Sequence, residues 1–124
     1  MTTGLELSGI NELEVAVGQA LGSCIQGSTD DARRATLNVL RRYNSPEFSK
    51  FRDSYGRLFA YAKSDSYREN FIKMSLCRDA VAEQAREDTI DPLTLMQDLG
   101  GLKTYLSVVK LDLELMEEEF RLAR

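Results

Sequence analysis

The sequence predicts an all-α, single-domain bundle of five to six helices with a long C-terminal helix. Three observations support this prediction. Apolar residues recur at spacings of three and four along most of the chain. Serine, aspartate and proline stand where helices would begin, and glycine stands where they would end. The 124 residues include only two prolines and eight glycines, which allows long helices, and their number suits one domain over residues 1–124.

Two helices are expected in the N-terminal third of the chain. The first covers about residues 9–26, and Gly27 ends it. Ser28 caps the second, with Asp31 three residues later as a short capping box, and this helix extends to about Tyr43. The apolar positions of the first helix have helical spacing: Ile10, Leu13, Val17, Leu21, Cys24 and Ile25.

The third helix raises a question about its many aromatic residues. Ser45 as N-cap and Pro46 at the first helical position begin it, and it extends to about Lys63. Aromatic side chains between cations are typical of a platform for nucleic-acid bases, but also of a core helix. At 100° per residue one stripe collects Phe48, Phe51, Tyr55, Leu58, Phe59 and Ala62. We therefore expect a core helix with a solvated basic face, and Tyr61 as a contact residue off the stripe.

Three further helices are expected after Lys63. One begins at Ser64 or Asp65 and covers residues 66–86. Asp91–Pro92 begins a short helix over residues 93–99, which Gly100–Gly101 ends, and the last helix extends from residue 102 to the C-terminus. Residues 109–115 alternate as a strand would, but they also fit helix spacing and no partner strand is evident, so a helix is favoured.

The last helix has apolar residues on two sides. One stripe consists of Leu102, Leu106, Val109, Leu113, Met116 and Phe120. The other consists of Tyr105, Val108, Leu111, Leu115 and Leu122. A helix that is apolar on two sides is either central in its bundle or shared with a partner chain. We expect self-association through residues 102–122, with the second stripe as the interface of a homo-oligomer.

Charge is segregated along the chain. Residues 1–31 carry a net charge of −5, residues 32–78 of +7 and residues 79–124 of −6, within a total of −4. The basic middle either lies against the acidic ends, within one bundle or between subunits, or contacts an acidic partner or nucleic acid. The candidate basic contact residues, with the exposed tyrosine, are Arg33, Arg34, Arg41, Arg42, Lys50, Arg57 and Tyr61.

Gly18 and Gly22 lie four residues apart in the first helix, and each costs about 1 kcal/mol relative to alanine there. This spacing predicts a tight helix crossing within the bundle or a kink. A subunit contact and a break of the helix at Gly22 are alternatives.

Composition argues against several classes of function. Histidine is absent, which removes the commonest general base and metal ligand, and no nucleophile motif or phosphate-binding loop is present. We therefore predict no enzyme, no cofactor and no metal. The N-terminus lacks a secretory pattern, and no stretch approaches the length of a membrane span. Cys24 and Cys77 are expected to be reduced thiols, with a disulfide between them as the alternative. These features predict a cytoplasmic, acidic protein without membrane contact.

The run IQGSTDDARRATLNVLRRYN, residues 25–44, resembles the helical N-terminal part of some phage small terminase subunits in its glycine, alanine and LNV–R pattern. The resemblance covers under a fifth of the chain and assigns no family, but it implies a viral or mobile-element protein as one origin.

The sequence predicts a non-catalytic interaction module: an oligomerising adaptor, an assembly factor or a protein-binding inhibitor, whose partners are itself and another protein. The alternative function is a nucleic-acid-binding regulator or DNA-packaging subunit that uses the basic central helices.

Overall fold

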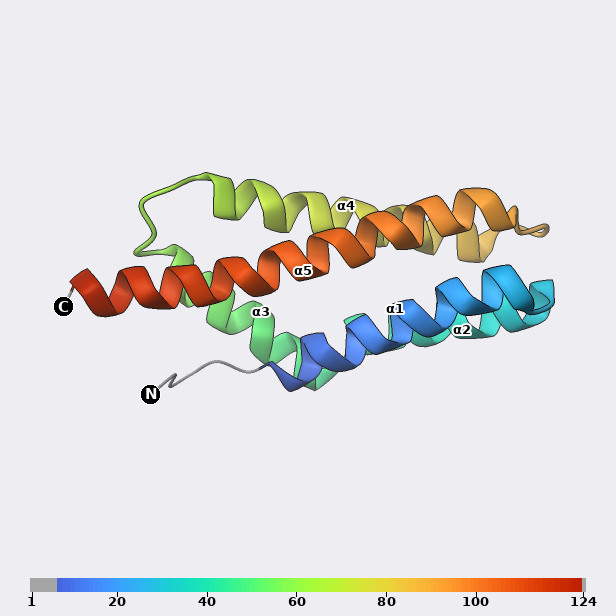
Figure 1. Cartoon of the computed structure of the whole chain (residues 1–124), viewed down its shortest axis with the longest axis horizontal. Helices are drawn as coiled ribbons and strands as arrows, with labels where there is room; N and C mark the ends of the chain where they lie inside the picture. Colours follow the sequence, from blue (N-terminus) through green and yellow to red (C-terminus); the bar gives the residue numbers. More distant parts are fainter. Residues whose placement is uncertain (1–6, 124) are drawn as a thin grey trace.

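Five α-helices make up the computed structural model, which describes residues 7–123. They are α1 (Ser8–Gln26), α2 (Thr29–Tyr43), α3 (Pro46–Phe59), α4 (Ser66–Arg86) and α5 (Pro92–Ala123). α1, α2, α4 and α5 form an up-down-up-down bundle, and the shorter α3 lies obliquely near one end (Figure 1). No strand occurs within residues 7–123. The predicted all-α bundle with a long C-terminal helix is confirmed, while the first six residues of the predicted non-secretory N-terminus, and Arg124, lie outside the described part.

The predicted caps of α2 and α3 are confirmed in atomic detail. The backbone N–H of Asp31 donates to Ser28 Oγ at 3.1 Å, and the N–H of Ser28 donates to Asp31 Oδ2 at 3.3 Å. At α3, Ser45 Oγ accepts from the N–H of Phe48 at 3.1 Å, and Pro46 takes the first helical position. These side chains satisfy donors that a helix start leaves without an intrahelical partner.

Asp91 caps the start of α5 in the same way, and α1 ends just before the glycine that was predicted to stop it. Asp91 Oδ1 accepts from the N–H of Leu93 at 3.2 Å, and Asp91 Oδ2 accepts from Thr94 Oγ1 at 2.8 Å. α1 ends at Gln26, and Gly27 is its C-cap. Local sequence signals thus set the starts of α2, α3 and α5 and the end of α1, whereas α1 and α4 begin without a side-chain cap.

The predicted separation of a short fifth helix from a sixth is wrong, because α5 continues through Gly100 and Gly101. Two glycines cost a helix interior about 2 kcal/mol together. Leu99 and Leu102, on either side of them, are completely buried. Burying a leucine side chain contributes roughly 1.5–3 kcal/mol, so the two leucines outweigh the two glycines.

α3 is shorter than predicted, since it ends at Phe59 rather than near Lys63. After the C-cap Ala60, the backbone N–H groups of Tyr61 and Ala62 donate to carbonyls three residues back, as in a tightened last turn. Beyond them Ser64 Oγ accepts from the N–H of Ser66 at 3.2 Å. Serine side chains that bind nearby backbone compete with helix formation, which explains the turn between α3 and α4.

Residues 109–115 are helical, as favoured over the strand pattern. Val109 and Leu113 are completely buried, whereas Leu111 and Leu115 are exposed. The apparent alternation therefore reflects two sides of one helix and not two faces of a sheet.

The aromatic stripe of α3 belongs to the core, as predicted. Phe48, Phe51 and Tyr55 are buried. Their rings continue a chain that begins at Tyr43 of α2 and ends at Phe71 of α4, with successive centroids 4.9, 5.6, 6.2 and 4.8 Å apart. Phe48, Phe51 and Tyr55 therefore pack inside the protein and offer no stacking platform to a nucleic acid.

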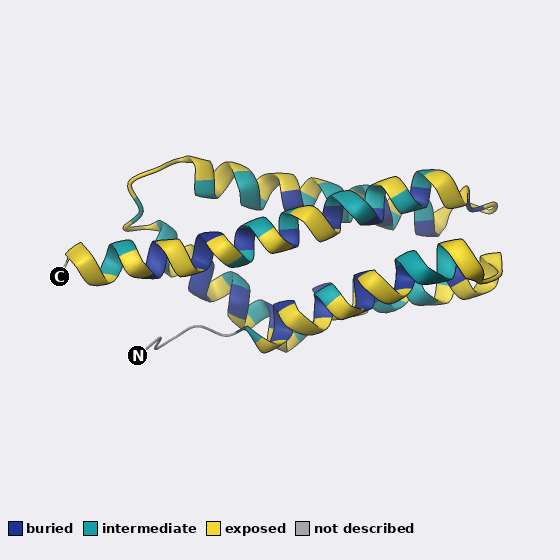
Figure 2. Ribbon diagram, in the orientation of Figure 1, coloured by how far each residue is buried: buried dark blue, intermediate teal, exposed yellow. Residues whose placement is uncertain are grey.

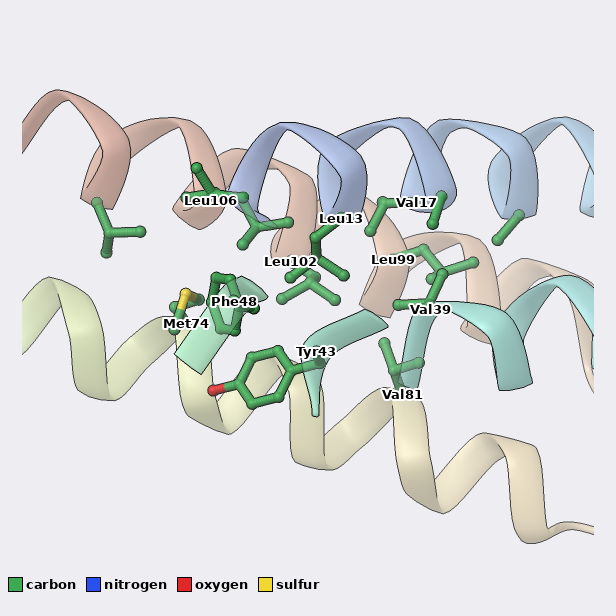
Figure 3. Packing of buried hydrophobic residues seen from close by; sticks show 14 of the residues in the cluster. Leu13, Val17, Val39, Tyr43, Phe48, Met74, Val81, Leu99, Leu102 and Leu106 are labelled. Carbon is green, nitrogen blue, oxygen red and sulfur yellow. The ribbon is translucent and has the colours of Figure 1, made fainter. Parts of the chain in front are cut away.

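Side chains from all four long helices meet in the centre of the bundle. Leu13, Val39, Val81 and Leu102 point toward one another from α1, α2, α4 and α5 (Figure 3). Buried positions line the inner side of each helix, and exposed positions line the outer side (Figure 2). In the part of the chain that is described, no helix has both the length and the hydropathy that a membrane span requires.

Candidate interaction surfaces

The predicted interface on α5 divides into exposed and partly covered residues. Leu111 is 55% exposed, Leu115 46% and Leu122 78%. Tyr105 and Val108 are only partly exposed, and Tyr105 packs against the core cluster. We call Leu111, Leu115 and Leu122 the α5 leucine surface. It is the part of the predicted interface that lies open on this protein.

The length of α5 leaves its C-terminal end, with Leu122, uncovered, whereas Leu111 is exposed because it lies on the outer side of the helix. Its 32 residues extend about 48 Å, whereas the 21 residues of α4 extend about 32 Å. The C-terminal end of α5 reaches beyond the ends of α1 and α4 (Figure 1). Its inner stripe, with Leu113 and Met116, is buried, but no helix of the described chain covers the outer side.

Charges beside the α5 leucine surface change sign along the helix. Lys103 and Lys110 come first, and Glu114 and Glu118 follow at the spacing of one helix face. Lys110 Nζ lies 3.1 Å from Glu14 Oε1 of α1, which ties this flank to the bundle. Lys103 and Lys110 thus form a basic half. Glu114 and Glu118 form an acidic half, in which Glu118 also pairs with Arg121.

A second surface lies on α2, where Arg34, Asn38 and Arg41 line one open groove between α1 and α2. The groove has a volume of about 790 Å³, and Gly22 of α1 forms part of its wall. Both arginines are exposed. The structure thus brings together three residues that helix spacing places on one face.

The other two predicted α2 contacts have partners inside the protein. Arg42 Nη1 lies 3.4 Å from Glu12 Oε2 of α1. Arg33 Nη1 donates to the carbonyl of Ala85 at 2.6 Å, and its Nη2 donates to the carbonyl of Glu87 at 2.7 Å. Arg33 therefore belongs to the packing of α2 against the end of α4 and does not join the groove.

The remaining predicted contacts lie on or just after α3, away from the α1–α2 groove. Lys50 is exposed, and Arg57 Nη2 donates to Ser54 Oγ at 3.2 Å. Tyr61 is 68% exposed, but its ring centroid lies 5.1 Å from that of Phe120 on α5. Tyr61 thus joins the turn after α3 to the end of α5 and still presents much of its surface to solvent.

The predicted tight helix crossing at Gly18 and Gly22 is wrong. A Cβ atom added at either glycine would meet nothing within 4 Å, so no helix packs closely there, and α1 neither breaks nor ends at Gly22. The close approach occurs instead at Gly9, where a Cβ would collide with the backbone of Glu47 and Phe48. Gly18 and Gly22 face open space, and Gly22 borders the groove.

Sequence reasoning missed a buried polar cluster at the junction of α3, α4 and α5. Asp112 is only 6% exposed, and its Oδ2 accepts from Tyr55 Oη at 3.2 Å and from Asn70 Nδ2 at 2.9 Å. The single phenol proton of Tyr55 is shared between this carboxylate and the carbonyl of Tyr67. Burial, together with the charge of Asp112, raises the pKa of Tyr55. The one sequence signal was an acid within an otherwise apolar stripe.

Tyr67 takes part in a second contact between α4 and α5. A hydrogen bond to the Glu119 carboxylate, with burial as a smaller cause, raises the pKa of Tyr67 to about 12. The neutral phenol is thus the form that the folded protein favours.

Two arginines stack on the aromatic core. The Arg52 guanidinium carbon lies 5.5 Å from the ring centroids of both Tyr43 and Phe48. That of Arg78 lies 5.0 Å from the Tyr43 centroid. Such cation–π contacts fix guanidinium groups at positions that flexible lysines would not hold.

Neither a metal-binding cluster nor a disulfide occurs in the described part of the chain. Among residues 7–123 no three Cys, Asp or Glu side chains are grouped closely enough to hold a metal ion. Cys24 on α1 and Cys77 on α4 are free thiols, and burial raises the pKa of both.

No family model, no curated protein and no solved structure matches this chain.

Proposed function

We propose that the protein is a non-catalytic helical interaction module, an oligomerising adaptor or assembly factor, that self-associates through the α5 leucine surface. The observation that supports this proposal is the exposure of three leucines on one side of a helix whose other side forms the core. Exposed leucines aligned on one helix side are typical of a protein interface, whereas scattered ones carry no such meaning.

A second copy of the chain fits this surface in the antiparallel direction. Antiparallel pairing of two α5 helices sets the basic half of each copy, with Lys103 and Lys110, beside the acidic half of the other, with Glu114 and Glu118. Parallel pairing would instead place like charges together. A two-fold axis between the helices makes the same leucines meet on both copies, as in the commonest class of homodimer.

Light scattering of the purified chain at low and high salt tests the proposal. We expect an oligomer that persists at high salt, because apolar contacts are not screened. Replacing Leu111→Gln and Leu115→Gln together should produce a monomer, whereas Ile25→Gln, which changes a 67% exposed side chain on α1, should leave the oligomer intact. A wild-type monomer, or an oligomer unaffected by the double change, would contradict the proposal.

A second candidate function is nucleic-acid binding through the α1–α2 groove. The observation that favours it is that Arg34 and Arg41 line one open groove, beside Arg42. Phosphate contacts by arginine make affinity fall steeply with salt.

Fluorescence anisotropy with a labelled DNA duplex at several salt concentrations separates the two functions. If the groove binds DNA, Arg34→Glu with Arg41→Glu should abolish binding. Lys50→Glu with Arg57→Glu, an equal charge change on α3, should weaken it much less. Equal losses in both double variants would mean attraction to general positive charge, and no binding at low salt would exclude the groove as a DNA site.

A further inference from the structure

A small apolar pocket lies between α3 and α4, apart from the α5 leucine surface and the α1–α2 groove. Its volume is about 270 Å³, and Tyr55, Phe59, Phe71 and Ile72 provide apolar walls. Phe59 and Phe71 are half-buried, and Ile72 is 47% exposed, so the aromatic core comes to the surface here. An apolar side chain that entered would meet rings and branched carbon on several sides.

Gly56 keeps this pocket open. It lies inside α3 and lines the pocket, and a Cβ atom added there would meet nothing within 4 Å. The protein's own packing therefore does not require a glycine, although glycine weakens a helix interior. A larger side chain at position 56 would instead project into the space that a ligand would use.

Two arginines border this almost wholly apolar pocket. Arg52 and Arg68 both line it, and none of the described residues that line it is acidic. Arg52 is held in place by its stacking over Tyr43 and Phe48. Arg68 is exposed, so its guanidinium is open to a carboxylate. Cationic side chains beside an apolar cavity favour an occupant that carries carboxylates close to an apolar group.

We propose that this pocket binds an acidic peptide segment of a partner protein, with one phenylalanine or leucine inserted between Arg52 and Arg68 and flanking carboxylates at the two guanidinium groups. Its volume lies just below the usual range for small-molecule sites, which begins at about 300 Å³, and suits a single anchoring side chain. The pocket shares no residue with the α5 leucine surface, and the proposed binding does not depend on self-association.

Titration of the full-length chain with synthetic peptides, followed by amide chemical shifts, tests this inference. The probe is an acetylated peptide with one phenylalanine between glutamates. Two matched peptides replace the phenylalanine with alanine, or the glutamates with lysines. We expect shifts at residues 52–59 and 68–72 with the probe, at least tenfold weaker binding of the alanine peptide, and none of the lysine peptide.

Two variants and a control test the two halves of the site. Gly56→Leu should weaken probe binding at least tenfold while keeping the helical circular dichroism, since leucine favours a helix more than glycine does. Arg68→Gln should weaken it about fivefold, in line with one partly exposed ion pair. Arg57→Gln, a change on the same helix but outside the pocket, should leave the affinity within about twofold. Unchanged binding in Gly56→Leu, equal binding of the alanine peptide, or no binding of the probe would each overturn the inference.

Discussion

Arg33 stabilises the packing of α2 against α4, whereas its neighbour Arg34 lines the open α1–α2 groove. Besides the carbonyls of Ala85 and Glu87, Arg33 Nη2 reaches the carbonyl of Asp88 at 3.2 Å. The last carbonyls of a helix have no intrahelical donor, so Arg33 of α2 caps α4 from another helix. Sequence reasoning grouped Arg33 with Arg34 because composition shows charge but not the direction of a side chain.

Arg33→Ala should lower the free energy of unfolding by about 2 kcal/mol, because it leaves several carbonyls without a charged donor. Urea unfolding of the wild type and the variant measures this difference. Arg34→Ala, one residue further along α2, is the matched control and should change stability by no more than about 0.5 kcal/mol. Equal effects of the two substitutions would mean that the cap contributes nothing specific.

Tyr67 makes stability depend on alkaline pH. Its pKa is about 12 in the folded protein and has an ordinary value of 10.0, so the unfolded chain loses the phenol proton first. Its contribution to stability is complete below pH 10 and is lost as the pH rises through about 12. The raised pKa of Tyr55 acts in the same direction.

Tyr67→Phe should therefore lessen the fall in unfolding free energy between pH 10 and about 12, as measured by urea unfolding at a series of pH values. Glu119→Gln should lessen it too, because it removes the carboxylate that holds the phenol proton. A decline as steep in both variants as in the wild type would show that other groups govern alkaline stability.

At the scale of helices, the starts were predictable from the sequence, whereas the interruption predicted at Gly100–Gly101 does not occur. Ser28, Ser45 and Asp91 cap helices through residues two or three positions away, so the sequence contains the whole interaction. The continuity of α5 across Gly100 depends instead on the burial of leucines by other helices. Sequence spacing records which residues share a side, but not how strongly a distant helix covers them.

The two glycines in α5 provide a matched pair for this argument. Gly100→Ala should raise the free energy of unfolding by about 1 kcal/mol, since a Cβ there meets nothing within 4 Å. Gly101→Ala should give a smaller gain or a loss, because its Cβ would lie 3.2 Å from Cys77 Sγ. Urea midpoints of both variants test the ranking. A larger gain for Gly101→Ala would show that α4 and α5 can separate there without cost.

In the whole molecule, the packing of the helices places oppositely charged parts of the sequence next to each other. α2 packs against α1 and α4 against α5, so the basic middle of the sequence lies beside both acidic ends. The Arg42–Glu12 ion pair is one direct contact between them. This arrangement agrees with the expectation that the charges oppose one another within one bundle.

The candidate surfaces were only partly predictable for the same reason. Periodicity identified both stripes of α5, but only the packed bundle distinguishes the buried Leu113 from the exposed Leu111. The α3–α4 pocket left no signal in the sequence, because residues far apart in the chain, such as Gly56 and Ile72, line it together. Surfaces that depend on one helix can be inferred from spacing, whereas those that need two helices require the fold.

Self-association through α5 has a consequence for the stability of the whole molecule. If only the folded chain pairs, then a tenfold increase in protein concentration adds about 1.4 kcal/mol per dimer to the free energy of unfolding, by mass action. The melting temperature of the wild type should therefore rise with concentration, as followed by circular dichroism across a dilution series. Ile25→Gln should keep this dependence, whereas Leu111→Gln with Leu115→Gln should melt at one temperature at every concentration. A wild type whose melting temperature ignores concentration would show that the folded chain does not pair in this range, and the leucines of α5 would then need another partner.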